Sequence, residues 1–120
     1  MSKIFIVEDH AIIRQGYMLL IHRAPDLEVC GEATTAEEAL AQIAVCHPAL
    51  VIADMSLPGL SGDEFVKALR LQYPQVKILV VSGHADESFA EGILAMGADG
   101  YLVKERAPQT LIDTIYQILS

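Results

Sequence analysis

Short apolar runs alternate along this chain with longer segments whose apolar positions recur every three or four residues. The short runs, bounded by turn residues, are typical of buried strands, and the longer spacing is typical of helices. The predicted strands span residues 3–8, 27–34, 49–54, 76–81 and 99–103. The predicted helices span residues 11–22, 36–46, 63–73, 87–96 and 108–119, with Thr35 and Asp86 as caps of the second and fourth.

This alternation predicts the α/β class, as a (βα)5 domain with a doubly wound, flavodoxin-like sheet of five parallel strands. The expected strand order is 2-1-3-4-5, with helices on both faces of the sheet. Ligands of such sheets bind outside the carboxyl ends of the strands, at the point where the strand order reverses. That point lies between the first and third strands.

Length and charge narrow the class of function. The chain has 120 residues, of which 52% are hydrophobic, which suits one compact domain over residues 1–120. Its formal net charge of −8 argues against binding DNA or anionic membranes, because phosphate contacts require clustered Lys and Arg. The apolar residues before Glu8 are too few for a secretory signal or a membrane span, so a cytoplasmic location is expected. Cys30 and Cys46 match no metal-binding spacing and are expected to be reduced, partly buried packing residues.

Polar residues follow the predicted strands where their carboxyl ends would meet. They are Glu8 and Asp9 at the end of the first strand, Asp54 at the end of the third, Ser82 after the fourth and Lys104 after the fifth. Carboxylates that converge repel one another unless a cation lies between them. Mg²⁺ prefers oxygen ligands and few protein carboxylates, so we expect it at Glu8, Asp9 and Asp54, with Mn²⁺ as an alternative ion.

The same cluster has the parts for phosphoryl transfer. Asp54 would be a carboxylate nucleophile that forms an aspartyl-phosphate, and the backbone carbonyl of Met55 could complete the metal shell. Lys104 would pair with a developing phosphoryl oxygen, and Ser82 would donate a hydrogen bond to another. Taken singly, each residue also has a plainer interpretation, as a helix cap, a turn former or a solvated strand end. The joint register of these residues favours the functional interpretation.

The chain as a whole resembles the receiver domain of bacterial two-component response regulators. The segments that carry this resemblance are Val7-Glu8-Asp9-His10, Asp54 with Leu57-Pro58-Gly59 and Gly62, Val81-Ser82-Gly83, and Gly97 to Lys104. The resemblance implies that Asp54 accepts phosphate from a sensor histidine kinase, a phosphotransfer protein or a small phosphodonor. It also implies a signalling switch that catalyses its own phosphoryl transfer and dephosphorylation and is not otherwise an enzyme.

The resemblance also implies how the switch works. Ser82 and Tyr101 match the hydroxyl and aromatic positions that move together on activation, and so would remodel the surface of the fourth helix, fifth strand and fifth helix. Ser56 and His84 match positions that influence the lifetime of the phosphoryl group. Tyr101 could instead be an ordinary packed aromatic, and His84 a solvated loop residue. His10, like the remaining histidines, is expected to have a capping or surface role and not to bind metal.

Some residues depart from the commonest receiver pattern. Glu8 stands where an aspartate is more usual, and Lys104 is followed by Glu105 and not by proline. The segment that follows Lys104 resembles that of regulators of the LuxR and NarL type. Those regulators carry a C-terminal helix-turn-helix domain, which is expected to lie outside these 120 residues. DNA binding would then depend on that domain, transcription would be the output, and a homodimer could form on activation. The alternative is a phosphorylation-independent receiver that acts through protein contacts. An aspartate-dependent phosphatase is disfavoured, because no DxDxT pattern follows the first strand.

Overall fold

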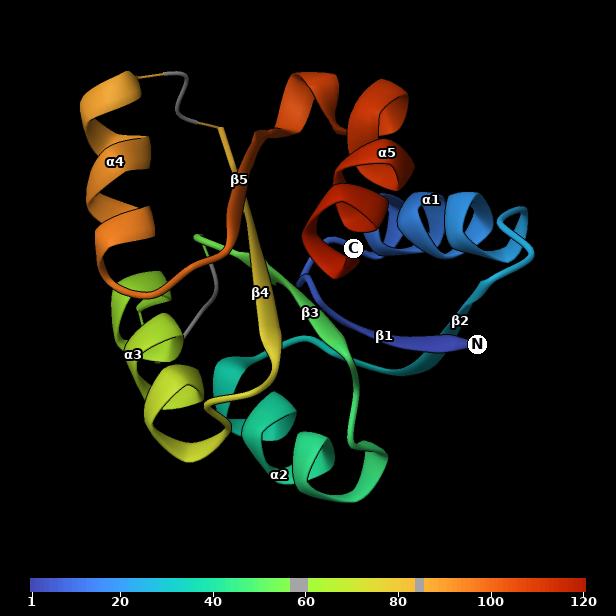
Figure 1. The fold of residues 1–120 in the computed structure, drawn as a ribbon, viewed down its shortest axis with the longest axis horizontal. Helices are drawn as coiled ribbons and strands as arrows, with labels where there is room; N and C mark the ends of the chain where they lie inside the picture. Colours follow the sequence, from blue (N-terminus) through green and yellow to red (C-terminus); the bar gives the residue numbers. More distant parts are fainter. Residues whose placement is uncertain (57–60, 84–85) are drawn as a thin grey trace.

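A computed structural model of the chain describes residues 1–56, 61–83 and 86–120, in which strands alternate with helices (Figure 1). The strands are β1 (Ser2–Val7), β2 (Leu27–Ala33), β3 (Leu50–Asp54), β4 (Lys77–Ser82) and β5 (Gly100–Val103). The α-helices are α1 (Ala11–His22), α2 (Ala36–Cys46), α3 (Gly62–Gln72), α4 (Glu87–Ala95) and α5 (Ala107–Leu119). These bounds confirm the predicted order of elements and agree with the predicted ends to within one residue.

The strands form one parallel sheet in the order β2-β1-β3-β4-β5, as predicted. In Figure 1, α1 and α5 lie together on one face of this sheet, and α2, α3 and α4 lie on the other. The strand order reverses between β1 and β3, so the connections diverge there and leave the ends of both strands accessible between loops.

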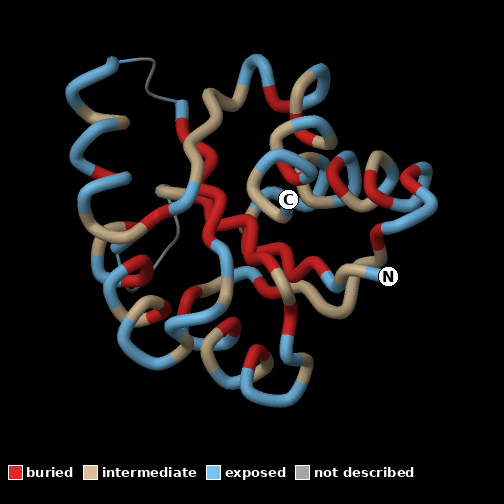
Figure 2. The backbone as a smooth tube through the Cα atoms, in the orientation of Figure 1, coloured by how far each residue is buried: buried red, intermediate tan, exposed pale blue. Residues whose placement is uncertain are grey.

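The core consists of two layers, one on each face of the sheet, because successive side chains of a strand point to opposite faces. Phe5 and Val7 of β1 pack with α2, α3 and α4, whereas Ile4 and Ile6 pack with α1 and α5. The central strand β3 is buried along its whole length, and Figure 2 shows buried backbone concentrated in the middle of the sheet. Burial on both faces explains why these strands read as continuous apolar runs.

Two predicted helix caps are confirmed. The side chain of Thr35 accepts a hydrogen bond from the backbone N–H of Glu38, and Asp86 accepts one from Ser88. Gly97, predicted to end α4, has a φ of 120°, a conformation that a residue without Cβ adopts at low cost. Ser61 also caps α3, since its hydroxyl accepts a hydrogen bond from the N–H of Glu64 at 3.3 Å. The sequence analysis missed this cap, although Ser and Glu three residues apart are its signature.

The segment after β5 differs from the prediction. A short 3₁₀ helix, η1 (Lys104–Arg106), connects the strand directly to α5, where a loop was expected. Pro108 lies in the first turn of α5, where its missing N–H leaves no hydrogen bond unmade. This compact connection keeps Lys104 at the end of the sheet.

The amino-terminal edge of the sheet is held by a network around Arg70 and Asp99. The guanidinium of Arg70 donates to the carbonyl of Gly97 at 2.6 Å and pairs with the Asp99 carboxylate at 2.7 Å. The same Asp99 oxygen, Oδ2, accepts a hydrogen bond from the backbone N–H of Ile78 at 2.8 Å. Arg70 also donates to the carbonyl of Val76, so this network joins α3 to the starts of β4 and β5.

Among the helices in the described ranges, none combines the length and apolar character required to cross a lipid bilayer.

Candidate functional site

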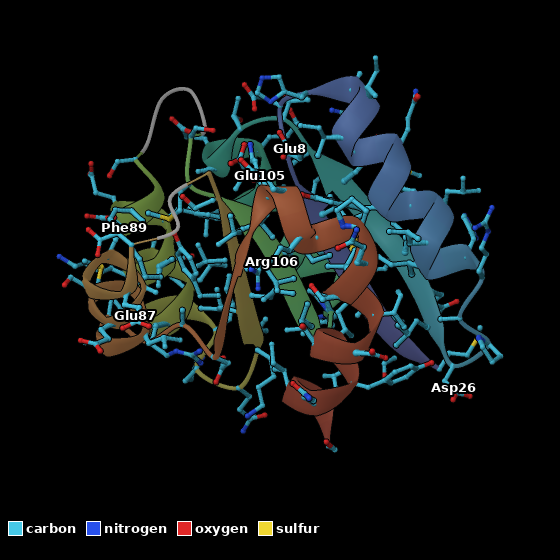
Figure 3. The ribbon with its side chains drawn as sticks, turned by 90° about the horizontal axis from the view of Figure 1, so that it is seen from above. Glu8, Asp26, Glu87, Phe89, Glu105 and Arg106 are labelled. Carbon is cyan, nitrogen blue, oxygen red and sulfur yellow. The ribbon has the colours of Figure 1, made fainter. Side chains whose placement is uncertain are left out.

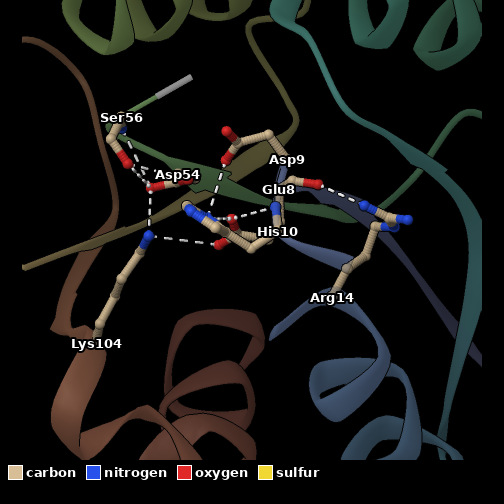
Figure 4. A network of polar contacts seen from close by, with 7 residues as sticks. All are labelled: Glu8, Asp9, His10, Arg14, Asp54, Ser56 and Lys104. Atoms are coloured by element: carbon tan, nitrogen blue, oxygen red, sulfur yellow. Dashed lines mark hydrogen bonds and ion pairs between the residues drawn. The ribbon is translucent and has the colours of Figure 1, made fainter. Parts of the chain in front are cut away.

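The register of the sheet brings the predicted site residues to one edge. Val7 lies opposite Ala53 in the β1–β3 pair, so Glu8, the next residue, lies beside Asp54. Asp54 lies opposite Val81, which places Ser82 one position further along, and Ser82 lies opposite Val103, the residue before Lys104. Parallel pairing therefore brings together residues that are far apart in the sequence, and it confirms the expected convergence (Figure 4).

Asp54 is buried, with 2% of its surface exposed, and is surrounded by donors. Its Oδ1 accepts hydrogen bonds from the backbone N–H and the hydroxyl of Ser56, and lies 3.1 Å from the Nζ of Lys104. Burial alone would raise the pKa of Asp54. The hydrogen bonds from Ser56 and the interaction with Lys104 outweigh burial and lower that pKa. Asp54 therefore stays ionised more readily than an ordinary aspartate.

Glu8 has the opposite electrostatic behaviour. It is fully buried, and burial raises its pKa, with a contribution from the neighbouring Asp54 charge. Lys104 is a weaker partner for Glu8 than for Asp54, since its Nζ lies 3.6 Å from Glu8 Oε1. The two carboxylates thus differ in proton affinity because burial dominates at Glu8, whereas hydrogen bonds, first that from the Ser56 N–H, outweigh burial at Asp54.

Two carboxylate oxygens of the cluster lack hydrogen bonds. Glu8 Oε1 and Asp9 Oδ1 are both buried from solvent and accept none from any residue in the described part of the chain. Ligand atoms from Glu8, Asp9, His10 and Asp54 all lie within 4.8 Å of one another. Buried anionic oxygens without donors are costly, and a divalent cation would satisfy both. The donor set therefore fits the Mg²⁺ predicted from the sequence.

His10 is a member of this cluster that the sequence analysis missed. Its Nδ1 lies 3.0 Å from Glu8 Oε2 and 3.2 Å from Asp9 Oδ1, and its backbone N–H also bonds Glu8. His10 is the exposed N-cap residue of α1, in agreement with the expected surface role, although no hydrogen bond from its side chain caps the helix within the described residues. The hydrogen bond to Glu8 and the charges of both acids raise the pKa of the imidazole. The turn after β1 folds the ring back onto the acids, an arrangement that spacing alone does not reveal.

A second missed contact orients the start of this loop. Arg14 on α1 donates from Nη1 to the backbone carbonyl of Glu8 at 2.9 Å, and its Nε pairs with Glu32 at 3.0 Å. The main chain carrying the acidic pair is thereby tied to α1 and β2. Arg14 was not singled out because its helix position resembles that of an ordinary surface residue.

A cleft of about 450 Å³ opens beside Asp54. Ser82 and Lys104 line it from the strand ends, and Phe89 lines it from α4. The other described residues that line the cleft are Met55, Ser56, Ser61, Gly62, Asp63 and Gly83. Ser82 is 2% exposed, and Lys104 extends from η1 toward Asp54. Since Met55 and Ser56 directly follow Asp54, the cleft lies next to the segment that carries the carboxylate.

Tyr101 lies on β5 away from the acids, against α4. Its ring meets that of Phe89 edge to face, with centroids 6.1 Å apart and planes at 70°. Figure 3 shows Phe89 at the α4 side of the molecule. Since Phe89 also lines the cleft, Phe89 connects Tyr101 with the space in front of Asp54. In this conformation Tyr101 is therefore a packed aromatic residue. Its role in the switch stays a prediction.

The remaining predicted residues have less support from the geometry. Met55 follows Asp54 directly, and its N–H donates to the carbonyl of Val81 at 3.2 Å, but no contact tests its own carbonyl as a metal ligand. His84 and the loop residues 57–60 lie outside the described residues, so the predictions for them stay open. Cys30 and Cys46 are free and partly buried, as expected, and burial raises the pKa of Cys30 to about 11.

The chain is similar to known proteins over most of its length. The family described as response regulator receiver domain matches residues 4–116. The chain is 34% identical over 113 residues to the transcriptional regulatory protein DegU of Brevibacillus brevis, covering 94% of this chain and 48% of that protein. It is also 34% identical over 116 residues to the nitrate/nitrite response regulator protein NarL of Escherichia coli, covering 97% of this chain and 54% of that protein.

A solved structure agrees with these matches. The crystal structure of a LuxR-family two-component response regulator from Aurantimonas sp. superposes with a TM-score of 0.93 at 35% identity, covering 99% of this chain and 85% of that one. The chain spans about half the length of the curated relatives it matches. The printed sequence therefore corresponds to one part of those longer proteins.

Proposed function

Because the chain belongs to the family of response regulator receiver domains, we propose that it is a phosphorylation-activated switch whose phosphoryl acceptor is Asp54. The observation that carries the proposal is the contrast between two buried carboxylates at the end of the sheet. Asp54 has a lowered pKa and lies 3.1 Å from Lys104, whereas Glu8 has a raised pKa. An ionised carboxylate is a suitable nucleophile.

The transfer needs little covalent chemistry from the protein. A carboxylate oxygen of Asp54 attacks the phosphorus of a phosphohistidine or an acyl phosphate, a P–O bond to Asp54 forms, and the bond to the leaving group breaks. The leaving imidazole or carboxylate departs with the bonding electrons. Lys104 is positioned to neutralise charge that develops on a phosphoryl oxygen, and Ser82, which lines the same cleft, to donate a hydrogen bond to another.

The acidic cluster would hold Mg²⁺, or Mn²⁺ in its place, through Glu8, Asp9, Asp54 and the carbonyl of Met55. The two buried oxygens that accept no hydrogen bond from the described residues support this assignment. When bound, the ion supplies positive charge next to the phosphoryl oxygens. Glu8 has a longer side chain than aspartate, and the backbone N–H of His10 holds its Oε2 at 3.0 Å.

Phosphorylation would be communicated through Ser82 and Tyr101. A phosphoryl group on Asp54 would draw the Ser82 hydroxyl toward it, and the space released would allow Tyr101 to move inward. The edge-to-face contact between Tyr101 and Phe89 would then be rearranged, and with it the surface of α4, β5 and α5. Ser56, whose hydroxyl bonds both Asp54 oxygens, would tune the lifetime of the phosphoryl group. His84 would tune the same lifetime.

The partners follow from the family. The phosphodonor would be a sensor histidine kinase or a phosphotransfer protein in the cytoplasm, and the activated domain would form a homodimer. Output would be transcriptional, through a C-terminal helix-turn-helix domain of the kind found in LuxR- and NarL-type regulators. The net charge of −8 supports assigning DNA binding to that domain and not to residues 1–120.

The test is the intact mass of the protein after incubation with acetyl phosphate and Mg²⁺. We expect a gain of one phosphoryl group, which disappears when EDTA replaces Mg²⁺ and in the Asp54→Asn variant. Asp63→Asn is the matched control, because Asp63 lines the same cleft on α3 but lies outside the acidic cluster.

Two results would contradict the proposal. Modification that persists in Asp54→Asn would assign the acceptor to another residue. No modification of the wild-type protein, under conditions that modify another receiver, would favour a phosphorylation-independent module that acts through protein contacts.

A further inference from the structure

We infer that His10 is a ligand of the acidic metal site, bound through Nδ1, and that it makes this site prefer late first-row divalent ions such as Co²⁺, Ni²⁺ and Zn²⁺ over Mg²⁺. The inference deepens the proposed function and depends on its metal site, because it concerns the same carboxylates. It departs from the expectation that the histidines of this chain do not bind metal.

The imidazole of His10 lies close to both acids of the cluster. Nδ1 of His10 lies 3.0 Å from Glu8 Oε2 and 3.2 Å from Asp9 Oδ1. Ligands at right angles around an ion, with bonds of about 2.1 Å, lie about 3 Å apart. The nitrogen is therefore already at the spacing of a neighbouring ligand to both acids. The ligand atoms of all four residues, including Asp54, lie within 4.8 Å of one another, which leaves room for one ion between them.

The hydrogen bond between His10 Nδ1 and Glu8 Oε2 satisfies only part of the cluster and leaves two buried acid oxygens for a ligand. The oxygens that accept no hydrogen bond from the described residues belong to Glu8 and Asp9, the two acids that the imidazole contacts. Glu8 is fully buried, yet one of its oxygens is left to Lys104 at 3.6 Å, beyond hydrogen-bonding distance. An ion coordinated by His10 Nδ1 would also reach these oxygens.

The identity of the ion follows from the added nitrogen. Carboxylate, carbonyl and water oxygens suit Mg²⁺ and Mn²⁺, whereas an imidazole raises affinity for Co²⁺, Ni²⁺ and Zn²⁺ much more than for Mg²⁺. The side chain of His10 is 58% exposed, so its outer nitrogen reaches solvent and the ring can turn slightly without disturbing the core. His10 is thus a specificity-determining residue at the entrance of the site.

The experiment measures binding of Co²⁺ and, separately, of Mg²⁺ by isothermal titration calorimetry at pH 8. It compares the wild-type chain with His10→Gln and with His22→Gln. His22 is exposed at the end of α1 and serves as the matched control for adventitious binding by a surface histidine. We expect His10→Gln to weaken Co²⁺ binding by about tenfold or more, and Mg²⁺ binding by less than twofold. Both affinities should be unchanged in His22→Gln.

Nuclear magnetic resonance of the Co²⁺ form provides a readout that a structural role of His10 would not produce. Coordination through Nδ1 places the Nε2–H proton close to the paramagnetic ion, so we expect a strongly shifted, solvent-exchangeable resonance that is absent in His10→Gln. Equal Co²⁺ affinity in the wild type and His10→Gln would overturn the inference, as would an equal loss of Co²⁺ and Mg²⁺ affinity or a missing resonance.

These outcomes are separate from those of the phosphorylation test. If Asp54 is never phosphorylated but His10 still controls Co²⁺ binding, the proposed switch fails and the metal inference stands. If phosphorylation occurs with Mg²⁺ and His10→Gln changes neither affinity, the metal inference fails and the switch stands.

Discussion

The two edges of the sheet use charged residues in opposite ways. At the amino-terminal edge, one cation and one anion, Arg70 and Asp99, satisfy each other and the surrounding backbone groups with contacts of 2.6 to 2.8 Å. At the carboxyl-terminal edge, the carboxylates of Glu8 and Asp54 share Lys104, and oxygens of Glu8 and Asp9 accept no hydrogen bond from the described residues. The first network is electrostatically complete within the chain, and the second is not.

This difference separates a structural network from a functional one. A charged network whose partners all come from its own chain contributes to stability, because removing Asp99 takes an acceptor from Arg70 and from the backbone N–H of Ile78. A buried cluster with excess negative charge reduces stability by itself and is expected where a ligand completes it. Substitutions at the amino-terminal edge should therefore destabilise the fold more than substitutions at the carboxyl-terminal edge.

The largest effect is expected from Asp99→Ala. This change removes one acceptor of Arg70 and the side-chain acceptor of the backbone N–H of Ile78, so we expect the free energy of unfolding to fall by about 1–3 kcal/mol. Urea denaturation followed by circular dichroism would measure it, with Asp113→Ala, an exposed acid on α5, as the control. A loss no larger than that of the control would show that the Arg70 network contributes little and that the two edges are alike.

A change of opposite sign is expected from Glu8→Gln. The amide cannot ionise, its oxygen can still accept from the N–H of His10, and Lys104 keeps Asp54 as its closer partner. Replacing a poorly satisfied buried charge is often neutral or stabilising, so we expect a gain of up to about 1 kcal/mol in EDTA near pH 8. An exposed glutamate on α4 provides the control, Glu91→Gln, which should have no effect.

The pH dependence of this variant follows from the raised pKa of Glu8. A carboxyl with a raised pKa in the folded protein favours folding while it is protonated, below its ordinary value of 4.5. That contribution is lost as the pH rises through the folded-state pKa. The wild type should therefore lose stability relative to Glu8→Gln as the pH rises above about 4.5, and a constant difference across the range would contradict the assignment.

The smallest effect is expected from Ser56→Ala. The hydroxyl donates to both oxygens of Asp54 at 3.1 and 3.3 Å, but the backbone N–H of Ser56 still bonds the carboxylate after the change. We expect the free energy of unfolding to fall by less than about 1 kcal/mol in the same denaturation assay. A loss as large as that of Asp99→Ala would mean that Asp54 depends on this loop for stability, and would remove the contrast between the edges.

Much of the fold was accessible to prediction because its signals are local. The apolar runs of β1, β3 and β4 and the spacing in α1 and α5 follow from burial on one or two faces, and the caps Thr35 and Asp86 follow from side chains that reach their own helix. The 3₁₀ helix that begins at Lys104 was not predicted, since the residue propensities of so short a segment do not distinguish a 3₁₀ turn from a loop. Ser61 carried a recognisable capping pattern that was overlooked.

The candidate site was accessible for a related reason. In a parallel sheet, the strand ends meet at one edge, so the positions of Glu8, Asp54 and Lys104 after their strands were enough to predict that they converge. Nothing in that argument gives the direction of a loop side chain. The contacts of His10 with both acids, and of Arg14 with the carbonyl of Glu8, depend on how the β1–α1 turn and α1 pack.

The sequence by itself thus determined the order of the elements, the strand order and the set of residues at the carboxyl edge, because periodicity and parallel pairing depend on position along the chain. Tertiary structure alone decided which charged side chains of the site lie nearest to one another. It placed Lys104 closer to Asp54 than to Glu8, buried Glu8 completely and brought the imidazole of His10 against the acids. Charge interactions and burial depend on distances of a few ångströms between segments remote in sequence, and those distances exist only once the chain has folded.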